Sequence, residues 1–348
     1  MSTSTGTSTS TSTDEKTGAG HAVRSFLRAR EIPVAGALIA LVIVTSVINP
    51  RFLSPQSVKD LMLNATIVII LAVGQALVII TRNVDRSIGS ILGLVAFATG
   101  TLFDLAPGVP IPLVFLGGMV FGAVLGAING ALVTAAKVPA LVITLGTMYI
   151  YRGVLASWAG SKQFFSGDNP KEFGNLSVDT FFGVPIITIV AIVVVIAVGF
   201  FMRAVRSGRD LYAIGSDPDA ARLFGIAVSK RVLAAFIASG ALTGLAGVLY
   251  TSRYNSVGAL TGSGLELDVV AAVVVGGVAI SGGTGTVVGA AIGAILLSTI
   301  TGALTATRVD KFWQQAIVGV LILAAIIVDR IVSVRNARKL RVSEARDV

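Results

Sequence analysis

The sequence predicts an all-α polytopic membrane protein with about ten transmembrane helices, and three observations lead to this fold class. The 348-residue chain is 54% hydrophobic and only 13% charged, about half the charged fraction of a soluble domain. Its mean hydropathy is +0.87. Its apolar residues occur in runs about 20 residues long, the length at which a helix crosses a bilayer.

Ten apolar runs are long enough to cross a membrane. They cover residues 32–49, 61–81, 87–105, 111–134, 138–158, 184–204, 231–250, 266–282, 286–306 and 312–332. Residues 51–60 suit a short interfacial helix or turn. The polar, glycine-rich residues 251–265 suit a re-entrant loop that lines a cavity.

Polar segments flank these spans. Residues 1–20 are nearly all Ser, Thr and Gly, and we expect a disordered cytoplasmic tail because they offer no apolar surface to bury. No apolar run with a cleavage site follows the start, so no signal peptide is expected. The remaining organisation is a transmembrane domain over 21–334, with a long cytoplasmic loop over 203–231, and a basic cytoplasmic tail over 335–348.

The charge distribution predicts the orientation. Most of the 27 Lys and Arg residues fall in the two tails and in alternate loops, including the 203–231 loop. Because positively charged loops stay in the cytoplasm, ten spans with both termini cytoplasmic fit best. This asymmetry also explains the net charge of +9. No nucleic-acid-binding signature accompanies it, so a nucleic acid partner is not expected.

Composition excludes several kinds of chemistry. The chain has no Cys, and its single His, His21, lies in the polar tail. Thiol catalysis, zinc clusters and nucleophile pairs with histidine are therefore excluded. The pattern G-x-x-x-x-G-K-[ST] does not occur, and the glycine-rich stretch 282–289 lacks its lysine. We expect no metal, no cofactor and no ATP hydrolysis by this chain, so a separate subunit would supply ATP-derived energy.

Glycines recur every four residues on several spans. Residues four apart share one helix face, and small residues there let backbones approach closely. The expectation is tight packing, or a surface that slides during a conformational change. The candidates for packing or gating are Gly118, Gly122, Gly126, Gly130, Glu266, Asp268, Gly276 and Gly277.

A weak internal repeat accompanies the glycines. Residues 122–128 (GAVLGAI) resemble residues 289–295 (GAAIGAI), and the predicted spans that contain them run in opposite directions. This pattern is typical of two inverted five-helix halves.

Polar residues inside the spans have two interpretations: they line a substrate path, or they join helices by hydrogen bonds. The candidates are Asn64, Gln75, Asp85, Asn129, Thr144, Thr147 and Tyr149. Asp85 also suits a helix N-cap or an ion pair with Arg82 or Arg86. Acidic residues deep in the spans are few, which argues against a carrier driven by an ion gradient.

The 203–231 loop contains the signals of a short helix. Ser216 or Asp217 suits its N-cap, Pro218 its first turn, and Gly225 the position after its end. Small and apolar residues lie between them, including Leu223 and Phe224. Such a helix, flanked by arginines under the membrane, suits docking into a groove on a cytoplasmic partner.

Several segments together resemble the permease subunits of ribose-, xylose- and rhamnose-type monosaccharide ABC importers. They are residues 83–90, 138–147 with Arg152 and Gly153, 207–226, 264–268, 276–277, 281–285, and Gly319 with Asp329. The resemblance covers roughly residues 60–330. In residues 83–87 the family usually has Gly-Ile-Asp-Leu-Ser. Asn83 resembles the rhamnose and autoinducer-2 branches, and Arg86 adds a charge in place of an apolar residue.

The resemblance implies a multi-pass subunit in the cytoplasmic (inner) membrane of a bacterium, without enzymatic activity. Its implied partners are a cytoplasmic ATPase that binds the ATP, an extracytoplasmic sugar-binding protein, a second permease copy (identical or related) and membrane lipid. The 207–226 loop becomes the element that seats in the ATPase. The residues carried over to that role are Gly208, Arg209, Tyr212, Ala213, Gly215, Asp217, Ala220, Ala221, Arg222, Gly225 and Ile226.

The predicted function is import of a monosaccharide by alternating access. The substrate would be a pentose, a hexose, a deoxyhexose such as rhamnose, or an autoinducer-2-like sugar derivative. Two alternatives stay open at this point: a secondary carrier driven by an ion gradient, and an intramembrane enzyme built on aspartates such as Asp85 and Asp268.

Overall fold

A computed structural model describes residues 31–310 apart from 137, 166 and 255, together with scattered residues between 313 and 323. The predicted tails, 1–20 and 335–348, lie outside the described residues. So does most of the predicted span 312–332.

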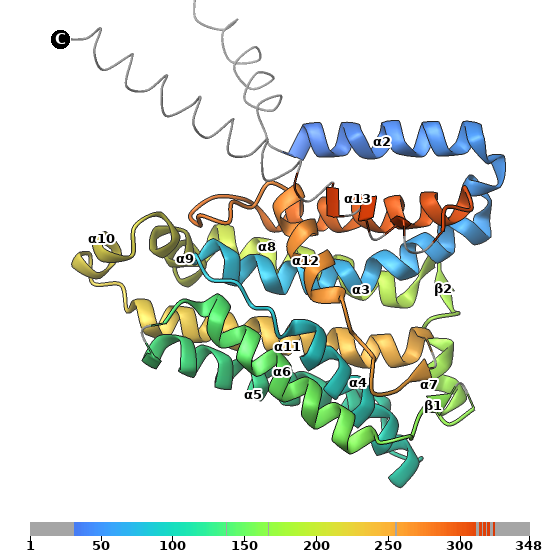
Figure 1. Cartoon of the computed structure of the whole chain (residues 1–348), viewed down its shortest axis with the longest axis horizontal. Helices are drawn as coiled ribbons and strands as arrows, with labels where there is room; N and C mark the ends of the chain where they lie inside the picture. The colour runs from blue at the N-terminus through green and yellow to red at the C-terminus, as the bar shows by residue number, and fades with distance from the viewer. Residues whose placement is uncertain are drawn as a thin grey trace, which may run out of the picture.

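The described chain is helical, with two small pairs of strands (Figure 1). The helices are α2 (Glu31–Ile48), η1 (Pro50–Leu53), α3 (Pro55–Ile80), α4 (Ile88–Leu105), α5 (Ile111–Ala136), α6 (Ala140–Ala159), α7 (Lys171–Asn175), α8 (Ile186–Ala204), α9 (Arg206–Ser216), α10 (Pro218–Leu223), α11 (Val228–Tyr254), α12 (Leu265–Val275) and α13 (Val287–Ala306). The strands are β1 (Phe164–Phe165), β2 (Thr180–Phe181), β3 (Val184–Pro185) and β4 (Ser256–Val257).

Seven described helices are long and apolar enough to cross a membrane: α3, α4, α5, α6, α8, α11 and α13. α2 is also apolar, over Pro33–Ile48. The prediction of a polytopic helical membrane protein is therefore confirmed.

The predicted span 266–282 is wrong in its extent. α12 has only 11 residues, which makes it about 16 Å long, roughly half the thickness of the hydrocarbon core. Turns follow it, and Gly277, Gly282, Gly283 and Gly285 all have positive φ. The apolar run continues through Ala279 and Ile280, but these glycines end the helix. Residues 258–264 do turn back into the bundle, as predicted, and lie against α4.

α3 is the central helix of the bundle. Ser54 caps its start by accepting a hydrogen bond from the Ser57 amide, and Pro55 occupies its first turn. Every residue from Ile69 to Ile80 is buried, as expected for a helix that is apolar on all sides. α8, α11, α12 and α13 pack around it (Figure 1).

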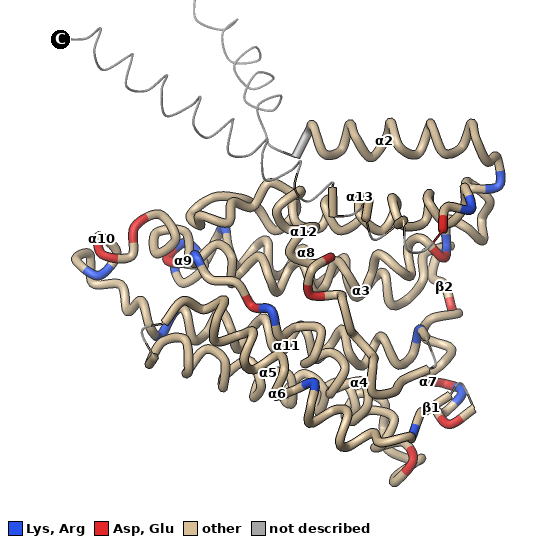
Figure 2. Tube along the Cα trace, viewed as in Figure 1, with Lys and Arg blue, Asp and Glu red and all other residues tan. Residues whose placement is uncertain are grey.

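The outer helices present apolar side chains on the bundle surface. Leu116 and Val120 on α5, and Ile196 and Phe200 on α8, are each more than half exposed. Charged residues instead gather at the two ends of the bundle, with few between (Figure 2). A surface with an apolar middle and charged ends matches the thickness and chemistry of a bilayer.

The glycine faces pack as the sequence predicts. Gly122 of α5 lies against Gly240 of α11, and a Cβ on Gly122 would be 2.2 Å from the Gly240 carbonyl oxygen. Gly289 of α13 lies equally close to Gly276, just after α12. Gly118, Gly126 and Gly130 continue the contact of α5 with α11.

The two ends of the bundle differ (Figure 1). α9 and α10 project from one end, hereafter the α10 end. The opposite end, hereafter the strand end, carries α7 and both antiparallel pairs. In these pairs Phe164 faces Val257, and Phe181 faces Val184.

Replacing Gly122 by alanine tests the close contact of α5 with α11. The added methyl group meets the Gly240 carbonyl, so the variant should lose about 1–3 kcal/mol of stability. In the control Gly117→Ala, the new methyl group has nothing within 4 Å, so stability should be unchanged or rise by up to about 1 kcal/mol. The measurement is the unfolding midpoint in detergent, and equal midpoints for both variants would contradict the packing argument.

Candidate functional site

The α10 end is built around a short capped helix. The Asp217 carboxylate accepts hydrogen bonds from the Asp219 and Ala220 amides, and Pro218 occupies the first turn. These bonds lower the pKa of Asp217, because they stabilise the ionised form. Gly225 follows the helix with a φ of +78°. The predicted helix in the 203–231 loop is confirmed, with Asp217 as its cap.

The tip of α10 is apolar and exposed. Leu223 is 89% exposed and Phe224 83% exposed. Ala221, on the opposite side, is buried against the bundle with Ile214 and Val232. Arg222 pairs with Asp219 on the outer surface. Two large apolar side chains at a polar end of a membrane protein are typical of a contact surface for another protein.

α9 is fastened to the bundle at its C-terminal end. The Arg82 guanidinium donates hydrogen bonds to the carbonyl oxygens of Gly215, at 2.5 Å, and Ser216. Gly215 also packs against the Ile80 carbonyl and the Gly283 amide so closely that a Cβ would not fit. The end of α9 is therefore held between the end of α3 and the turn before α13.

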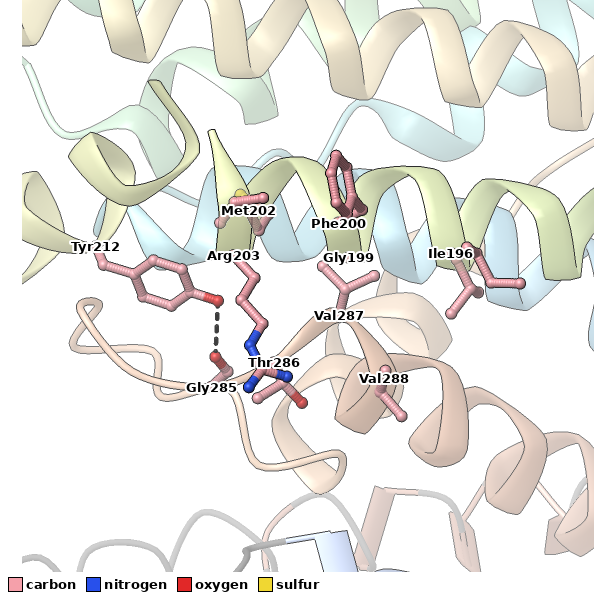
Figure 3. A pocket seen from close by; sticks show the side chains of 12 residues that line it. Ile196, Gly199, Phe200, Met202, Arg203, Tyr212, Gly285, Thr286, Val287 and Val288 are labelled. Carbon is pink, nitrogen blue, oxygen red and sulfur yellow. Dashed lines mark hydrogen bonds between the residues drawn. The ribbon is translucent and has the colours of Figure 1, made fainter. Parts of the chain in front are cut away.

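Two further bonds hold the middle of α9. The Tyr212 hydroxyl donates to the Gly285 carbonyl at 3.0 Å (Figure 3), and burial raises the pKa of Tyr212. Asp210 forms an ion pair of 2.9 Å with Arg231, at the start of α11. Beside the Tyr212–Gly285 bond, α8 and the start of α13 form an apolar groove of about 990 Å³, in which Arg203 extends from α8 toward Thr286 (Figure 3).

The residues predicted for coupling divide into two groups. Those on α9 fix the helix to the bundle: Gly208 lies against the Phe201 carbonyl, and Arg209 donates to the Ala204 carbonyl. The remainder shape or flank α10. They are Asp217, Ala220, Ala221, Arg222, Gly225 and Ile226. Ala213 lies on α9, and its carbonyl accepts from the Asp217 amide. The side chains that the tip presents outward, Leu223 and Phe224, were not among the predicted coupling residues.

A second group of predicted residues forms a buried hydrogen-bond network. Asp85 accepts from the Ser87 amide at 2.8 Å and the Ser87 hydroxyl at 2.7 Å. Asn129 donates to Ser87 at 2.6 Å and accepts from the Tyr151 hydroxyl at 3.1 Å. Asp85, Ser87 and Asn129 have no exposed surface. This network joins the start of α4 to α5 and α6.

The network corrects the expectation of an N-cap or an ion pair at Asp85. Ser87, rather than Asp85, occupies the N-cap position of α4. Arg82 turns away to α9, and among the described residues Asp85 forms no ion pair with Arg82 or Arg86. Asp85 is satisfied by neutral donors, so its geometry is that of a helix-joining residue.

The other predicted path residues differ in their surroundings. Thr144 donates to the Val84 carbonyl, and Thr147 to the Thr144 carbonyl. Gln75 is fully buried, and neither atom of its amide group has a hydrogen-bond partner within the described chain. Tyr149 is 72% exposed on the outer face of α6.

The starts of α4 and α12 meet inside the bundle. Gly89 and Gly262 lie in mutual contact, each too close to the other's carbonyl for a Cβ. Glu266 lies directly against Gly89. Arg152 of α6 donates to the Thr261 carbonyl at 2.6 Å, which holds the 258–264 turns in place. The packing role predicted for Gly276 and Glu266 therefore agrees with their positions, while a gating role stays a prediction.

A polar pocket of about 440 Å³ opens toward the strand end. One wall is a stripe on α3: Ser57, Asp60 and Asn64. The facing wall is a stripe on α13: Ser298, Thr301 and Thr305. Tyr254 at the end of α11, and Leu265 and Asp268 on α12, complete the lining with Phe52, Leu61, Val68, Gly302 and Ala306.

The pocket mixes satisfied and unsatisfied polar groups. Arg253 pairs with Asp60 at 3.2 Å, and the Tyr254 hydroxyl donates to Asn64 at 3.2 Å. The Ser298 hydroxyl is buried without a partner in the described chain. No donor to the Asp268 carboxylate is found among the described residues either. The pocket therefore offers free hydrogen-bonding groups at its inner side.

The sequence predicts one residue of this lining, Asn64, as a path candidate, and another, Asp268, as a candidate for packing or gating. The spacing of the polar residues on α3 and α13 is the sequence signal that indicates the remaining lining. Ser57, Asp60 and Asn64 recur at intervals of three and four, as do Ser298, Thr301 and Thr305. Each set therefore shares one helix face. That these two faces oppose each other follows from the packing of α3 on α13, which the spacing alone does not predict.

Comparison with known proteins places the chain in a family. Residues 57–326 match the family model described as "Branched-chain amino acid transport system / permease component". The chain belongs to this permease family. The prediction of a multi-pass transport subunit of a bacterial cytoplasmic membrane is thereby confirmed.

Several relatives of this permease carry one name. The present chain is 36% identical over 307 residues to the Autoinducer 2 import system permease protein LsrC of Enterobacter sp. (strain 638), with 88% of each chain covered. The Klebsiella pneumoniae protein of that name is 35% identical, again with 88% of each chain covered. That of Escherichia coli O9:H4 is 34% identical over 313 residues, covering 89% of this chain and 90% of the relative. No significant match to a solved structure was found.

The Asp217 cap has a specific expected effect. Asp217→Ala should speed amide hydrogen exchange in α10, because the Asp219 and Ala220 amides lose their acceptor. Asp217→Asn should keep most of the protection, and Asp219→Ala, at an exposed surface pair, should leave it unchanged. Because the pKa of Asp217 is lowered, the cap should persist through mildly acidic pH and weaken only as the pH falls through that lowered value. Equal exchange in the Asp217→Ala and wild-type proteins would contradict this role.

Proposed function

We propose that this permease is the membrane-spanning subunit of an ABC importer that carries a monosaccharide or an autoinducer-2-like sugar derivative into the cytoplasm by alternating access. The observation that carries the proposal is 34–36% identity, over almost the whole chain, to permeases of autoinducer 2 import systems. The exposed helix α10 supports the proposal, because a permease without an ATP-binding motif needs a surface on which an ATP-hydrolysing subunit binds.

The α10 end is the cytoplasmic end in this proposal. The positive loops and tails predicted to be inside include the 203–231 loop that forms α9 and α10. The chain then has about ten membrane segments with both termini cytoplasmic: α2, the seven long helices, the half-length α12 and a segment near 312–332. The tails 1–20 and 335–348 flank a transmembrane domain over 21–334.

Packing supports two inverted halves. α11 packs against α5 and α4, and α3 packs against α13 and α12. α4 and α12, the two helices whose starts meet at Gly89 and Gly262, would correspond to each other under an inverted repeat. α5 and α13, which carry the similar GAVLGAI and GAAIGAI stretches, would also correspond. Transporters of this kind bind substrate between such halves.

The proposal assigns a partner to each polar surface. A cytoplasmic ATPase, which binds the ATP, seats on α10 and on the coupling residues of α9. An extracytoplasmic sugar-binding protein meets the strand end. A second permease copy covers part of the bundle side, and membrane lipid covers the rest. Asn64 is the predicted path residue that this proposal retains beside the polar pocket, and neither a metal nor a nucleic acid takes part.

Uptake into proteoliposomes tests the function. Vesicles that contain the permease with its ATPase and binding protein should accumulate labelled autoinducer 2 or a monosaccharide only when ATP is supplied. ADP is the control, since it binds without driving a cycle. Uptake by the chain alone under a proton or sodium gradient would contradict the proposal and favour the secondary carrier.

The tip of α10 gives a second test. Phe224→Ala removes an exposed aromatic side chain from the proposed ATPase contact and should weaken association with the ATPase about tenfold or more. The matched control is Phe182→Ala, which removes an equally exposed phenylalanine (92% exposed) at the strand end. Affinity of the purified subunits in detergent measures the difference, and equal losses for both variants would contradict the assignment of α10.

A further inference from the structure

The polar pocket at the strand end is unusual in a bundle of this composition. α3 and α13 are mainly apolar, yet each turns a stripe of hydroxyl, carboxamide or carboxylate groups toward the other. Polar groups within membrane helices are costly unless they pair with one another or line a water-filled cavity. Here the two stripes do not bond across the space between them in the described chain. The pocket therefore remains hydrated or holds a polar ligand.

We infer that this pocket binds a neutral polyhydroxylated molecule on its way through the permease. The inference rests on the proposed import function and adds to it the place and chemistry of the substrate site. A volume of about 440 Å³ lies within the range of small-molecule sites, about 300–1,000 Å³. It accommodates one monosaccharide-sized ligand.

The donors and acceptors of the lining match hydroxyl groups. Asp60, Asn64 and Asp268 supply acceptors, and the unpartnered Ser298 hydroxyl can both donate and accept. The hydroxyls of Ser57, Thr301 and Thr305 donate to backbone carbonyls, and each keeps a lone pair that can accept from a ligand. The unpartnered groups, Ser298 and Asp268, lie on different walls, so a ligand with several hydroxyls satisfies both at once. Tyr254 is 42% exposed, and its ring lies tilted against that of Tyr250 with 4.4 Å between the ring centroids. It adds an aromatic surface to the pocket.

Charge selects against anions. Two carboxylates line the pocket, and its described lining includes no Lys or Arg. The nearest guanidinium, Arg253, is engaged by Asp60. A phosphorylated sugar would place negative charge beside Asp60 and Asp268, and the same holds for the carboxylate of a branched-chain amino acid. The pocket therefore favours a neutral polyol over the substrate class named by the family model.

The Arg253–Asp60 pair sits at the mouth and is partly exposed, with side-chain exposures of 23% and 45%. An ion pair in contact with water contributes little on its own. A sugar hydroxyl that donates to Asp60 can therefore compete for the carboxylate at small cost. The buried network around Asp85, by contrast, is fully satisfied and closed, and offers a ligand no free group.

Substrate protection of a single cysteine tests the site. Because the natural chain has no cysteine, Thr301→Cys places one thiol in the pocket, and Thr180→Cys places one on exposed β2 at the same end. The complete complex in proteoliposomes is treated with a charged, membrane-impermeant methanethiosulfonate. The probes are autoinducer 2, D-ribose, D-xylose and L-rhamnose, with L-leucine as the amino acid.

At about ten times its Kd, the transported sugar should slow modification of the Thr301→Cys protein about tenfold, because only the unoccupied fraction reacts. It should not affect the Thr180→Cys protein. Adding Asp268→Asn should raise the sugar concentration needed for protection about tenfold, because a charge-assisted hydrogen bond is lost. Adding Asp104→Asn, at an exposed pair with Lys162, should leave it unchanged.

The outcomes separate this inference from the proposed function. ATP-driven sugar uptake without protection of the Thr301→Cys protein overturns the pocket assignment and leaves the importer intact. Protection by L-leucine equal to that by the sugar overturns the selection for a neutral polyol. Absence of any ATP-driven sugar uptake by the wild-type complex overturns the proposed function itself.

Discussion

Close backbone contact between glycine faces is the interaction on which the rest of this bundle depends. In a bilayer, lipid tails are as apolar as leucine side chains, so helices gain little by burying apolar area against one another. Gly122 and Gly240, and Gly276 and Gly289, instead bring backbones into direct contact. These contacts hold α5 on α11 and α13 on the end of α12, and thereby position both α4 and α12 with their starts touching.

Polar groups then divide according to whether they are satisfied. Asp85, Ser87, Asn129 and Tyr151 complete one another's hydrogen bonds and fix the start of α4 in the interior. The stripes on α3 and α13 face a cavity, do not bond to each other across it, and leave the Ser298 hydroxyl without a partner in the described chain. Burying an unpaired polar group in a membrane costs free energy. The first arrangement is therefore typical of residues that join helices, and the second is typical of a ligand-binding site. This distinction depends on geometry, because both groups contain the same residue types.

The sequence predicted what depends on local chemistry. Apolar runs placed seven of the long helices, and Asp217, Pro218 and Gly225 placed α10 to within a residue. The spacing of the glycines identified faces that pack. The prediction from sequence was wrong where a contact between residues far apart in the chain determines the geometry. Arg82 donates to the carbonyls of Gly215 and Ser216 rather than pairing with Asp85, because α9 ends beside it. The run 266–282 is apolar throughout, and only the left-handed glycines after Gly276 show that the helix stops halfway. The stripes were visible in the sequence, but their opposition follows from the antiparallel packing of α3 on α13.

Because α3 and α13 are antiparallel, the contacts that hold α9 and the polar pocket lie at opposite ends of the same two helices. One end of α3 and the turn before α13 grip Gly215, and the other ends of the same two helices are the walls of the polar pocket. α3 and α13 thus contact α9 at one end of the bundle and line the polar pocket at the other. A partner that contacts α10 therefore lies at one end of the same two helices whose other ends line the pocket.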